Sequence, residues 1–318
     1  MYLTFHGLRE APFGPAPDPK FLFQSARHQD ALAQLIYGVR ERKGFILLTG
    51  EIGTGKTTLL RALFEQLDGT TPVAYINNTK VGIEGLLEHA FLEWRVPSTA
   101  CRHGERLAEL NRFLVDRHRE GVSPVLVIDE AQNLSTETLE AVRLLSNFET
   151  ARQKLLQIVL VGQPELRDKL NTPALRQLKQ RIGLRCHLSP LSPEEIRLYI
   201  DHRLRVAGAR DAPFTDAAFR KIADYSRGTP RLINSVCDRA LLSAFAESKR
   251  QIEAADVKNA IAYVEDGEES RTRRDEVGLV PPTAVWAGRA GVGVLVVLLM
   301  AVLAFAANAM GWLGARGY

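Results

Sequence analysis

The 318-residue sequence is poor in cysteine and has no strong charge bias. Its three cysteines, Cys101, Cys186 and Cys237, are scattered and form no CxxC pair, which argues against a disulfide framework and favours ordinary thiols in a reducing compartment. The seven histidines form neither an HExxH motif nor a cluster with cysteine, so the sequence predicts no zinc site. The net charge of +4 gives no strong case for nucleic-acid binding.

The N-terminus lacks the apolar core of a secretory signal, because MYLTFHGLREAPFGPAPDP contains an early acid and several prolines. We therefore expect roughly the first 280 residues to stay on the side of the membrane where they are made.

Short apolar runs alternate with helical patterns in the first part of the chain. Strands are predicted at 45–50, 73–77, 124–131, 155–162 and 182–191. Helical patterns lie between them, for example at 56–66, 82–94 and 105–121. This alternation predicts an α/β fold with a parallel sheet that helices cover on both faces.

The pattern changes after Leu191, where helices follow one another with no predicted strand between them. Ser192, Pro193 and Glu195 form a predicted N-cap, first helical position and capping box. A charged and then proline-rich stretch follows. We predict an α/β core at 1–190, a small all-α lid at 191–266, a linker at 267–288 and one further helix at 289–315.

The stretch GEIGTGKT fits G-x-x-x-x-G-K-[ST] and lies between a predicted strand and a predicted helix, as a phosphate-binding loop requires. Its backbone N–H groups and the helix N-terminus would bind phosphate oxygens. Lys56 would place a charge on the β- and γ-phosphates, and the Thr57 hydroxyl would ligate Mg²⁺. The predicted nucleotide-binding residues are Gly50, Glu51, Ile52, Gly53, Thr54, Gly55, Lys56, Thr57 and Thr58.

The run VLVIDE supplies two acids at the carboxyl end of a buried strand, where α/β sheets bind ligands. Asp129 would hold Mg²⁺ through water, and Glu130 would orient and deprotonate the attacking water. Having both acids argues for hydrolysis rather than binding alone. The letters DEAQ also occur in helicases, but a helicase needs a second sheet, and a helical module follows here.

Three further residues would complete such a site. Gln163 ends the strand LQIVLVG and would hold the lytic water and report on the γ-phosphate. The region 174–188 contains Arg176, Arg181 and Arg185, and we favour Arg181 as a finger that reaches the nucleotide of a neighbouring subunit. Arg231, after Gly228 and Pro230, would lean over the γ-phosphate from the lid.

These motifs together resemble an AAA+ ATPase. The stretches VLVIDEAQNLS, LVGQPELRDKL, LRQLKQRI and GTPRLINSVCDRALL, together with the N-terminal 57 or so residues, are similar to the ExeA/GspA family of secretion ATPases over about residues 1–265. The resemblance implies binding of ATP with Mg²⁺, hydrolysis by Asp129 and Glu130, sensing by Gln163 and Arg231, and a trans arginine at Arg181.

The resemblance also implies partners. Family members are inner-membrane ATPases that couple cytoplasmic ATP use to assembly of type II secretion pores, MSHA-type pili or exopolysaccharide systems. We expect ATP-dependent self-association, in a hexameric ring or in dimers, and an envelope partner in the inner membrane. Fuller members carry a periplasmic peptidoglycan-binding domain, which we do not find in this sequence.

The tail from Ala290 to Ala315 contains no charged residue. As a helix it would span about 39 Å at ~1.5 Å per residue, more than the ~30 Å of a bilayer core. Trp286 and Trp312 bracket it as interfacial anchors would, and most nearby arginines precede it. We predict a single-pass inner-membrane protein with its ATPase domain in the cytoplasm; a buried or interfacial helix is the alternative.

Two other functions remain open at this stage. An AAA+ ATPase of transposition or replication would bind DNA as an ATP-dependent filament, although the tail and the mild charge argue against it. A scaffold could use ATP only as a switch, although intact Lys56, Asp129 and Glu130 argue for turnover.

Overall fold

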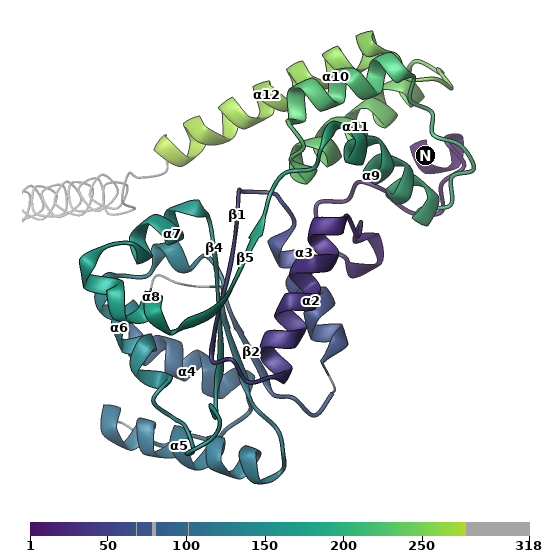
Figure 1. The fold of residues 1–318 in the computed structure, drawn as a ribbon. Coiled ribbons are helices and arrows are strands. Elements are labelled where there is room, and N and C mark those ends of the chain that lie inside the picture. The colour runs from purple at the N-terminus through teal and green to yellow at the C-terminus, as the bar shows by residue number, and fades with distance from the viewer. Residues whose placement is uncertain (68, 78–80, 101, 278–318) are drawn as a thin grey trace, which may run out of the picture. The chain divides into compact units, whose positions relative to one another are not determined.

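The computed structural model describes residues 1–277 except 68, 78–80 and 101. Its central feature is a five-stranded parallel sheet in the order β2-β3-β4-β1-β5 (Figure 1). The strands are β1 (Phe45–Gly50), β2 (Val73–Ile76), β3 (Val125–Ile128), β4 (Gln157–Gly162) and β5 (Ile182–Leu188). The parallel sheet predicted from the strand–helix alternation is thereby confirmed.

In β1, β3 and β4, alternate residues face two separate apolar clusters, which is why these strands read as continuous apolar runs. In β1, Phe45 and Leu47 belong to one cluster, and Ile46 and Leu48 belong to the other. Both faces of the sheet are therefore buried, as the sequence predicts.

Helices cover the two faces unequally (Figure 1). One face carries α2 (Ala26–Arg40) and α3 (Lys56–Gln66). The other carries α4 (Ile83–Glu93), α5 (His103–Arg119), α6 (Thr136–Leu145), α7 (Pro164–Leu170) and α8 (Arg176–Arg181). Three short 3₁₀ helices complete this part: η1 (Pro19–Phe21), η2 (Ala131–Asn133) and η3 (Pro173–Leu175).

The strand order positions the functional residues. Because β1 lies next to β4, and β4 next to β3, the loops that leave these three strands meet at one edge of the sheet. The loop after β1 is GEIGTGK, the loop after β3 begins at Asp129, and the loop after β4 begins at Gln163. The carboxyl edge of a parallel sheet is where such folds bind ligands.

After β5 the chain is helical, with α9 (Pro193–Val206), α10 (Asp216–Ser226), α11 (Pro230–Ala246) and α12 (Ala254–Val277). The capping box at the start of α9 is confirmed: the Glu195 backbone N–H donates to Ser192 Oγ, and the Ser192 backbone N–H donates to a carboxylate oxygen of Glu195. The described residues contain no strand beyond β5.

The N-terminal segment packs on these lid helices. Tyr2, in the short helix α1 (Tyr2–Phe5), donates its hydroxyl to Asp238 Oδ1 at 2.8 Å, and the Arg9 N–H donates to the Ala207 carbonyl at 2.8 Å. The sequence assigns this segment to the α/β core, so the contact with the lid is found only in the structure. The predicted domain boundaries stay a prediction.

Helix α12 continues to Val277, past the end of the predicted lid at residue 266 and into the predicted linker at 267–288. None of the helices described up to Val277 combines the length and apolarity needed to cross a bilayer. The predicted membrane helix at 289–315 lies outside the described residues.

Candidate functional site

The loop after β1 is built around glycines that leave no room for side chains. Gly53 and Gly55 have φ of +80° and +99°, a left-handed backbone that favours glycine. A Cβ on Gly50 would lie 2.8 Å from the Leu188 carbonyl oxygen on β5. The loop can therefore turn tightly between β1 and α3 only with glycine at these positions.

The loop ends at the exposed backbone donors of α3. Gly55 is the N-cap residue of α3, and no side chain of the described residues caps this end. The first N–H groups of a helix lack intrahelical partners and carry the positive end of its dipole. This end of α3 is therefore suited to a phosphate group.

Lys56 lies inside the loop. It is 6% exposed, and its Nζ donates to the carbonyls of Gly50 at 2.7 Å and Glu51 at 3.0 Å. Burial lowers the pKa of the Lys56 ammonium, and the nearby carboxylates of Glu130 and Asp129 oppose that shift. The ammonium thus lies between the loop and the acidic end of β3.

Asp129 and Glu130 lie directly after β3. The Asp129 carboxylate accepts one hydrogen bond on each oxygen, from the Glu130 backbone N–H at 2.9 Å and from the Tyr75 hydroxyl at 2.7 Å. Glu130 adopts φ of +51°, which is uncommon for a non-glycine residue. This left-handed turn lies between β3 and the 3₁₀ helix η2, of which Glu130 is the N-cap residue.

Two glutamine side chains hold the Glu130 carboxylate. Gln132 Nε2 and Gln163 Nε2 both donate to Glu130 Oε2, at 2.5 Å and 3.2 Å. Gln132 Oε1 in turn accepts the Gln163 backbone N–H at 3.2 Å. A Cβ on Gly162 would lie 2.6 Å from Gln132 Oε1, so Gln132 lies directly over the end of β4. Gln163 is placed beside Glu130, and Gln132 is a contact that the sequence reasoning missed.

Oxygen ligands for a metal converge beside these acids. Tyr75 on β2 donates its hydroxyl to Asp129, and the Thr57 side chain is near enough to this hydroxyl to oppose the rise that burial causes in the pKa of Tyr75, so the two predicted metal residues have a common neighbour. Within the described residues no group of three His, Cys, Asp or Glu forms a metal cluster. A hydroxyl, a carboxylate and nucleotide phosphates are the oxygen ligands that Mg²⁺ prefers, so Thr57 and Asp129 fit Mg²⁺ held jointly with a nucleotide.

Tyr75 itself was not identified from the sequence. Burial first, then its hydrogen bond to Asp129 and the charge of that residue, raise the pKa of Tyr75, so its hydroxyl stays protonated as a donor. The only sequence signal was a tyrosine on an edge strand of otherwise apolar residues.

A buried histidine supports the loop from α2. His28 Nε2 lies 3.3 Å from the Thr54 carbonyl oxygen, and its Nδ1 lies 2.8 Å from Ser25 Oγ. Because a carbonyl only accepts, Nε2 carries the proton and Nδ1 accepts from the Ser25 hydroxyl. Burial lowers the pKa of His28, which keeps the ring neutral.

The lid reaches the loop through the start of α11. The Arg231 backbone N–H donates to the Gly53 carbonyl at 3.2 Å. A Cβ on Gly53 would lie 2.6 Å from the Arg231 Cβ, while the Arg231 side chain is exposed. The structure therefore brings Arg231 to the loop, as its predicted role requires.

The remaining predicted residues are placed differently. Arg181, the last residue of α8, donates to Ser146 Oγ at 2.5 Å and Asn147 Oδ1 at 2.7 Å, beyond the end of α6. It is thus held by its own chain, away from the loop contacts described above. Ile52 is 56% exposed on the loop, the Glu51 carbonyl accepts from Lys56, and Thr58 lies in the first turn of α3.

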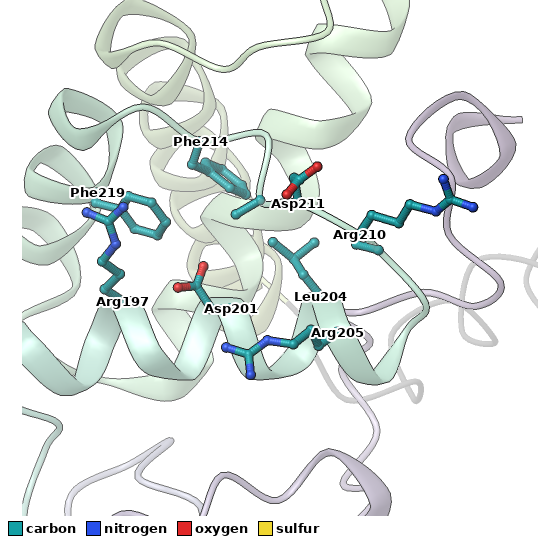
Figure 2. Close-up of a pocket in the computed structure, with 10 residues that line it drawn as sticks. Arg197, Asp201, Leu204, Arg205, Arg210, Asp211, Phe214 and Phe219 are labelled. Carbon is teal, nitrogen blue, oxygen red and sulfur yellow. The ribbon is translucent and has the colours of Figure 1, made fainter.

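A separate cavity of about 350 Å³ lies within the lid (Figure 2). Its walls mix arginines and aspartates with Phe214 and Phe219, and Arg197 there already pairs with Asp216 and stacks on Phe219. None of the predicted site residues lines it, so it does not contribute to the site after β1.

The site can be compared with known proteins. Residues 39–170 match a family described as an AAA domain. The chain is 46% identical over 268 residues to general secretion pathway protein A of Aeromonas hydrophila, covering 84% of this chain and 49% of the relative. It is 26% identical over 225 residues to the Holliday junction branch migration complex subunit RuvB of Chlorobaculum parvum, covering 69% and 58%.

A solved structure shows the same fold. Cdc6p from Pyrobaculum aerophilum aligns with a TM-score of 0.61 at 22% identity, covering 78% of this chain and 69% of that one. At this identity the likeness concerns the fold alone. The chain spans about half the length of the curated relatives it matches.

Proposed function

Because the chain belongs to the family of general secretion pathway protein A, with an AAA domain, we propose that it is a membrane-tethered ATPase that drives or regulates assembly of a bacterial envelope complex. One observation carries the enzymatic part: the loop lysine Lys56, the acids Asp129 and Glu130, and Gln163 meet at one edge of the sheet. ATP hydrolysis requires, among other groups, a positive charge that binds the phosphates and a fixed carboxylate that orients the attacking water.

Each residue has a role in this proposal. The loop N–H groups and Lys56 bind and orient the phosphates, which requires Lys56 to exchange its bonds to the Gly50 and Glu51 carbonyls for phosphate oxygens. Thr57 and Asp129 would hold Mg²⁺, which when bound supplies positive charge against the β- and γ-phosphates.

Glu130 orients the attacking water and accepts its proton. Gln132 and Gln163 hold the Glu130 carboxylate in place through its Oε2 atom. Arg231, from the lid, would contact the γ-phosphate and so connect the nucleotide state to the lid.

The experiment is ATP turnover by the full chain in detergent, measured against protein concentration, with Glu130→Gln beside it. We expect turnover in the wild type, and a loss of at least about 100-fold in Glu130→Gln with nucleotide binding retained. The exposed Glu88 on α4 provides the matched control, Glu88→Gln, which should behave as the wild type. Wild-type turnover no higher than that of Glu130→Gln would overturn hydrolysis in favour of an ATP-binding switch.

The uncharged apolar tail supports the membrane tether, and the similarity to general secretion pathway protein A of Aeromonas hydrophila supports the envelope role. Flotation with phospholipid vesicles tests the tether, with the full chain compared with a variant that stops after Gly288. We expect only the full chain to float and to resist alkaline extraction. A full chain that stays at the bottom of the gradient would remove the tether from the proposal.

A DNA-binding ATPase is the second candidate, favoured by the match to a Holliday junction branch migration subunit. Fluorescence anisotropy with duplex DNA, with and without ATP, separates the two. Salt-dependent binding that requires ATP would support the second candidate, whereas we expect none.

A further inference from the structure

Tyr75 lies between the two residues proposed to hold Mg²⁺. It comes from β2, the edge strand next to β3, and its hydroxyl donates to Asp129 Oδ2 at 2.7 Å. The Thr57 side chain, in the first turn of α3, is near enough to the same hydroxyl to oppose the rise that burial causes in the pKa of Tyr75. The hydroxyl thus lies between the first turn of α3 and the acidic end of β3.

The position of this hydroxyl is fixed by packing. The Tyr75 ring packs edge-to-face on Phe64 of α3, with centroids 6.0 Å apart and an interplanar angle of 67°. Its backbone is held by pairing with β3. Because ring and backbone are both held, the hydroxyl oxygen is held in one position next to Asp129.

The Asp129 carboxylate is held at both oxygens as a result. Oδ1 accepts the Glu130 backbone N–H at 2.9 Å, Oδ2 accepts the Tyr75 hydroxyl, and the residue is 4% exposed. Rotation of the carboxylate would break at least one of these bonds. A carboxylate has about four lone-pair sites, so both bonds leave acceptor capacity for a metal or its water.

Resting on the proposed function, we infer that Tyr75 is a positioning residue that presents Asp129 to the Mg²⁺ of a bound nucleotide. It acts through the Asp129 carboxylate and needs no contact with the nucleotide itself. Groups that hydrogen-bond to metal ligands fix the orientation of those ligands, and their loss typically weakens metal affinity 10- to 100-fold.

The test is Tyr75→Phe, which removes the hydroxyl and keeps the ring on Phe64. The full chain is titrated with MgCl₂ in the presence of a fluorescent, non-hydrolysable ATP analogue, and its affinity for the analogue is also measured in EDTA. We expect the half-saturating Mg²⁺ concentration to rise about tenfold in Tyr75→Phe. We expect the affinity in EDTA to stay close to the wild-type value, while the Tm falls modestly because a hydrogen bond to the buried Asp129 carboxylate is lost.

Tyr37→Phe is the matched control. Tyr37 is exposed on α2, so the loss of its hydroxyl should leave both titrations unchanged. A merely structural role for Tyr75 would weaken binding of the analogue in EDTA as much as in Mg²⁺, and this result would overturn the inference.

The Mg²⁺ titration has two further decisive outcomes. An unchanged half-saturating concentration in Tyr75→Phe would show that the hydroxyl does not serve the metal, and a lower one would show that it competes with the metal; either overturns the inference. A wild type that binds the analogue without any response to Mg²⁺, or does not bind it, would instead contradict the proposed function.

Discussion

The backbone N–H of Arg231 donates to the carbonyl oxygen of Gly53 at 3.2 Å, which joins the first turn of α11 to the phosphate loop. The two residues are so close that glycine is required at position 53. Any movement of the loop on binding a nucleotide must change this bond. The contact therefore gives the lid a direct means of responding to the nucleotide.

Gly53→Ala should disrupt this contact and the loop itself. The new Cβ would lie 2.6 Å from the Arg231 Cβ, and φ of +80° is strained for alanine. We expect nucleotide affinity to fall at least about tenfold, since backbone strain of this kind is of order 1–3 kcal/mol. Isothermal titration with ATPγS measures it.

The matched control is Gly69→Ala, where a Cβ meets no atom within 4 Å of the described structure. Equal affinities in the wild type and Gly53→Ala would show that the loop moves away from Arg231 without penalty.

Gln132→Ala should impair turnover more than binding. Gln132 donates to the Glu130 carboxylate and accepts from the Gln163 backbone N–H, so it acts on the group that we propose orients the water. A hydrogen bond to a charged group is worth about 1.5–3 kcal/mol, so we expect kcat to fall about 10- to 100-fold. KM for ATP should change little, and steady-state kinetics measure both. Gln66→Ala is the control, because Gln66 is exposed at the end of α3. A rise in the KM of Gln132→Ala at constant kcat would contradict the role given to Gln132.

Arg181 offers a test by mixing subunits. If it completes a neighbour's site, Arg181→Ala and Glu130→Gln are each inactive, but a mixture contains sites with an intact Glu130 and an intact neighbouring Arg181. With random assembly of equal amounts, about a quarter of the sites are intact, so activity should recover to about a quarter of wild type.

Arg181 also bonds to Ser146 and Asn147 of its own chain, so the Tm of Arg181→Ala must be compared with that of the wild type. Arg185→Ala serves as the control, because the Arg185 guanidinium also donates to its own chain, at the Lys179 carbonyl. No recovery on mixing would restrict Arg181 to this structural role.

His28 should make stability depend on pH. Burial lowers its pKa in the folded state below the ordinary value of 6.5, so at acidic pH the unfolded chain binds a proton that the folded chain does not. The His28 contribution to stability is therefore fully present above that value and is lost as pH falls below it. Thermal unfolding from about pH 8 to about pH 5 should show a falling Tm.

His28→Gln, whose amide can still donate to the Thr54 carbonyl, should show a smaller fall in Tm. Some pH dependence should remain, because burial also lowers the pKa of His6 and His202. The same fall in the variant and the wild type would rule out His28 as a source.

Much of the fold follows from local sequence signals. The helix predicted at 56–66 and the strand predicted at 45–50 occur with those bounds, because a glycine-rich loop separates a continuous apolar run from a helical pattern. Ser192 and Glu195 start α9 as predicted, since a capping box involves only backbone groups within one turn. Helix α12 extends past the predicted end of the lid, because the apolar periodicity that predicts a helix ends before the helical backbone does.

The sequence by itself determined which residues are predicted to bear the chemistry, because the spacing from Gly50 to Thr57 and the two acids after an apolar run can be recognised without knowing their partners. Only the tertiary structure decided what holds them. Tyr75, Gln132 and His28 come from three different elements, and each acts through a hydrogen bond to another part of the chain. Such contacts depend on strand order and on the packing of side chains between elements, and neither propensity nor periodicity along the chain encodes these.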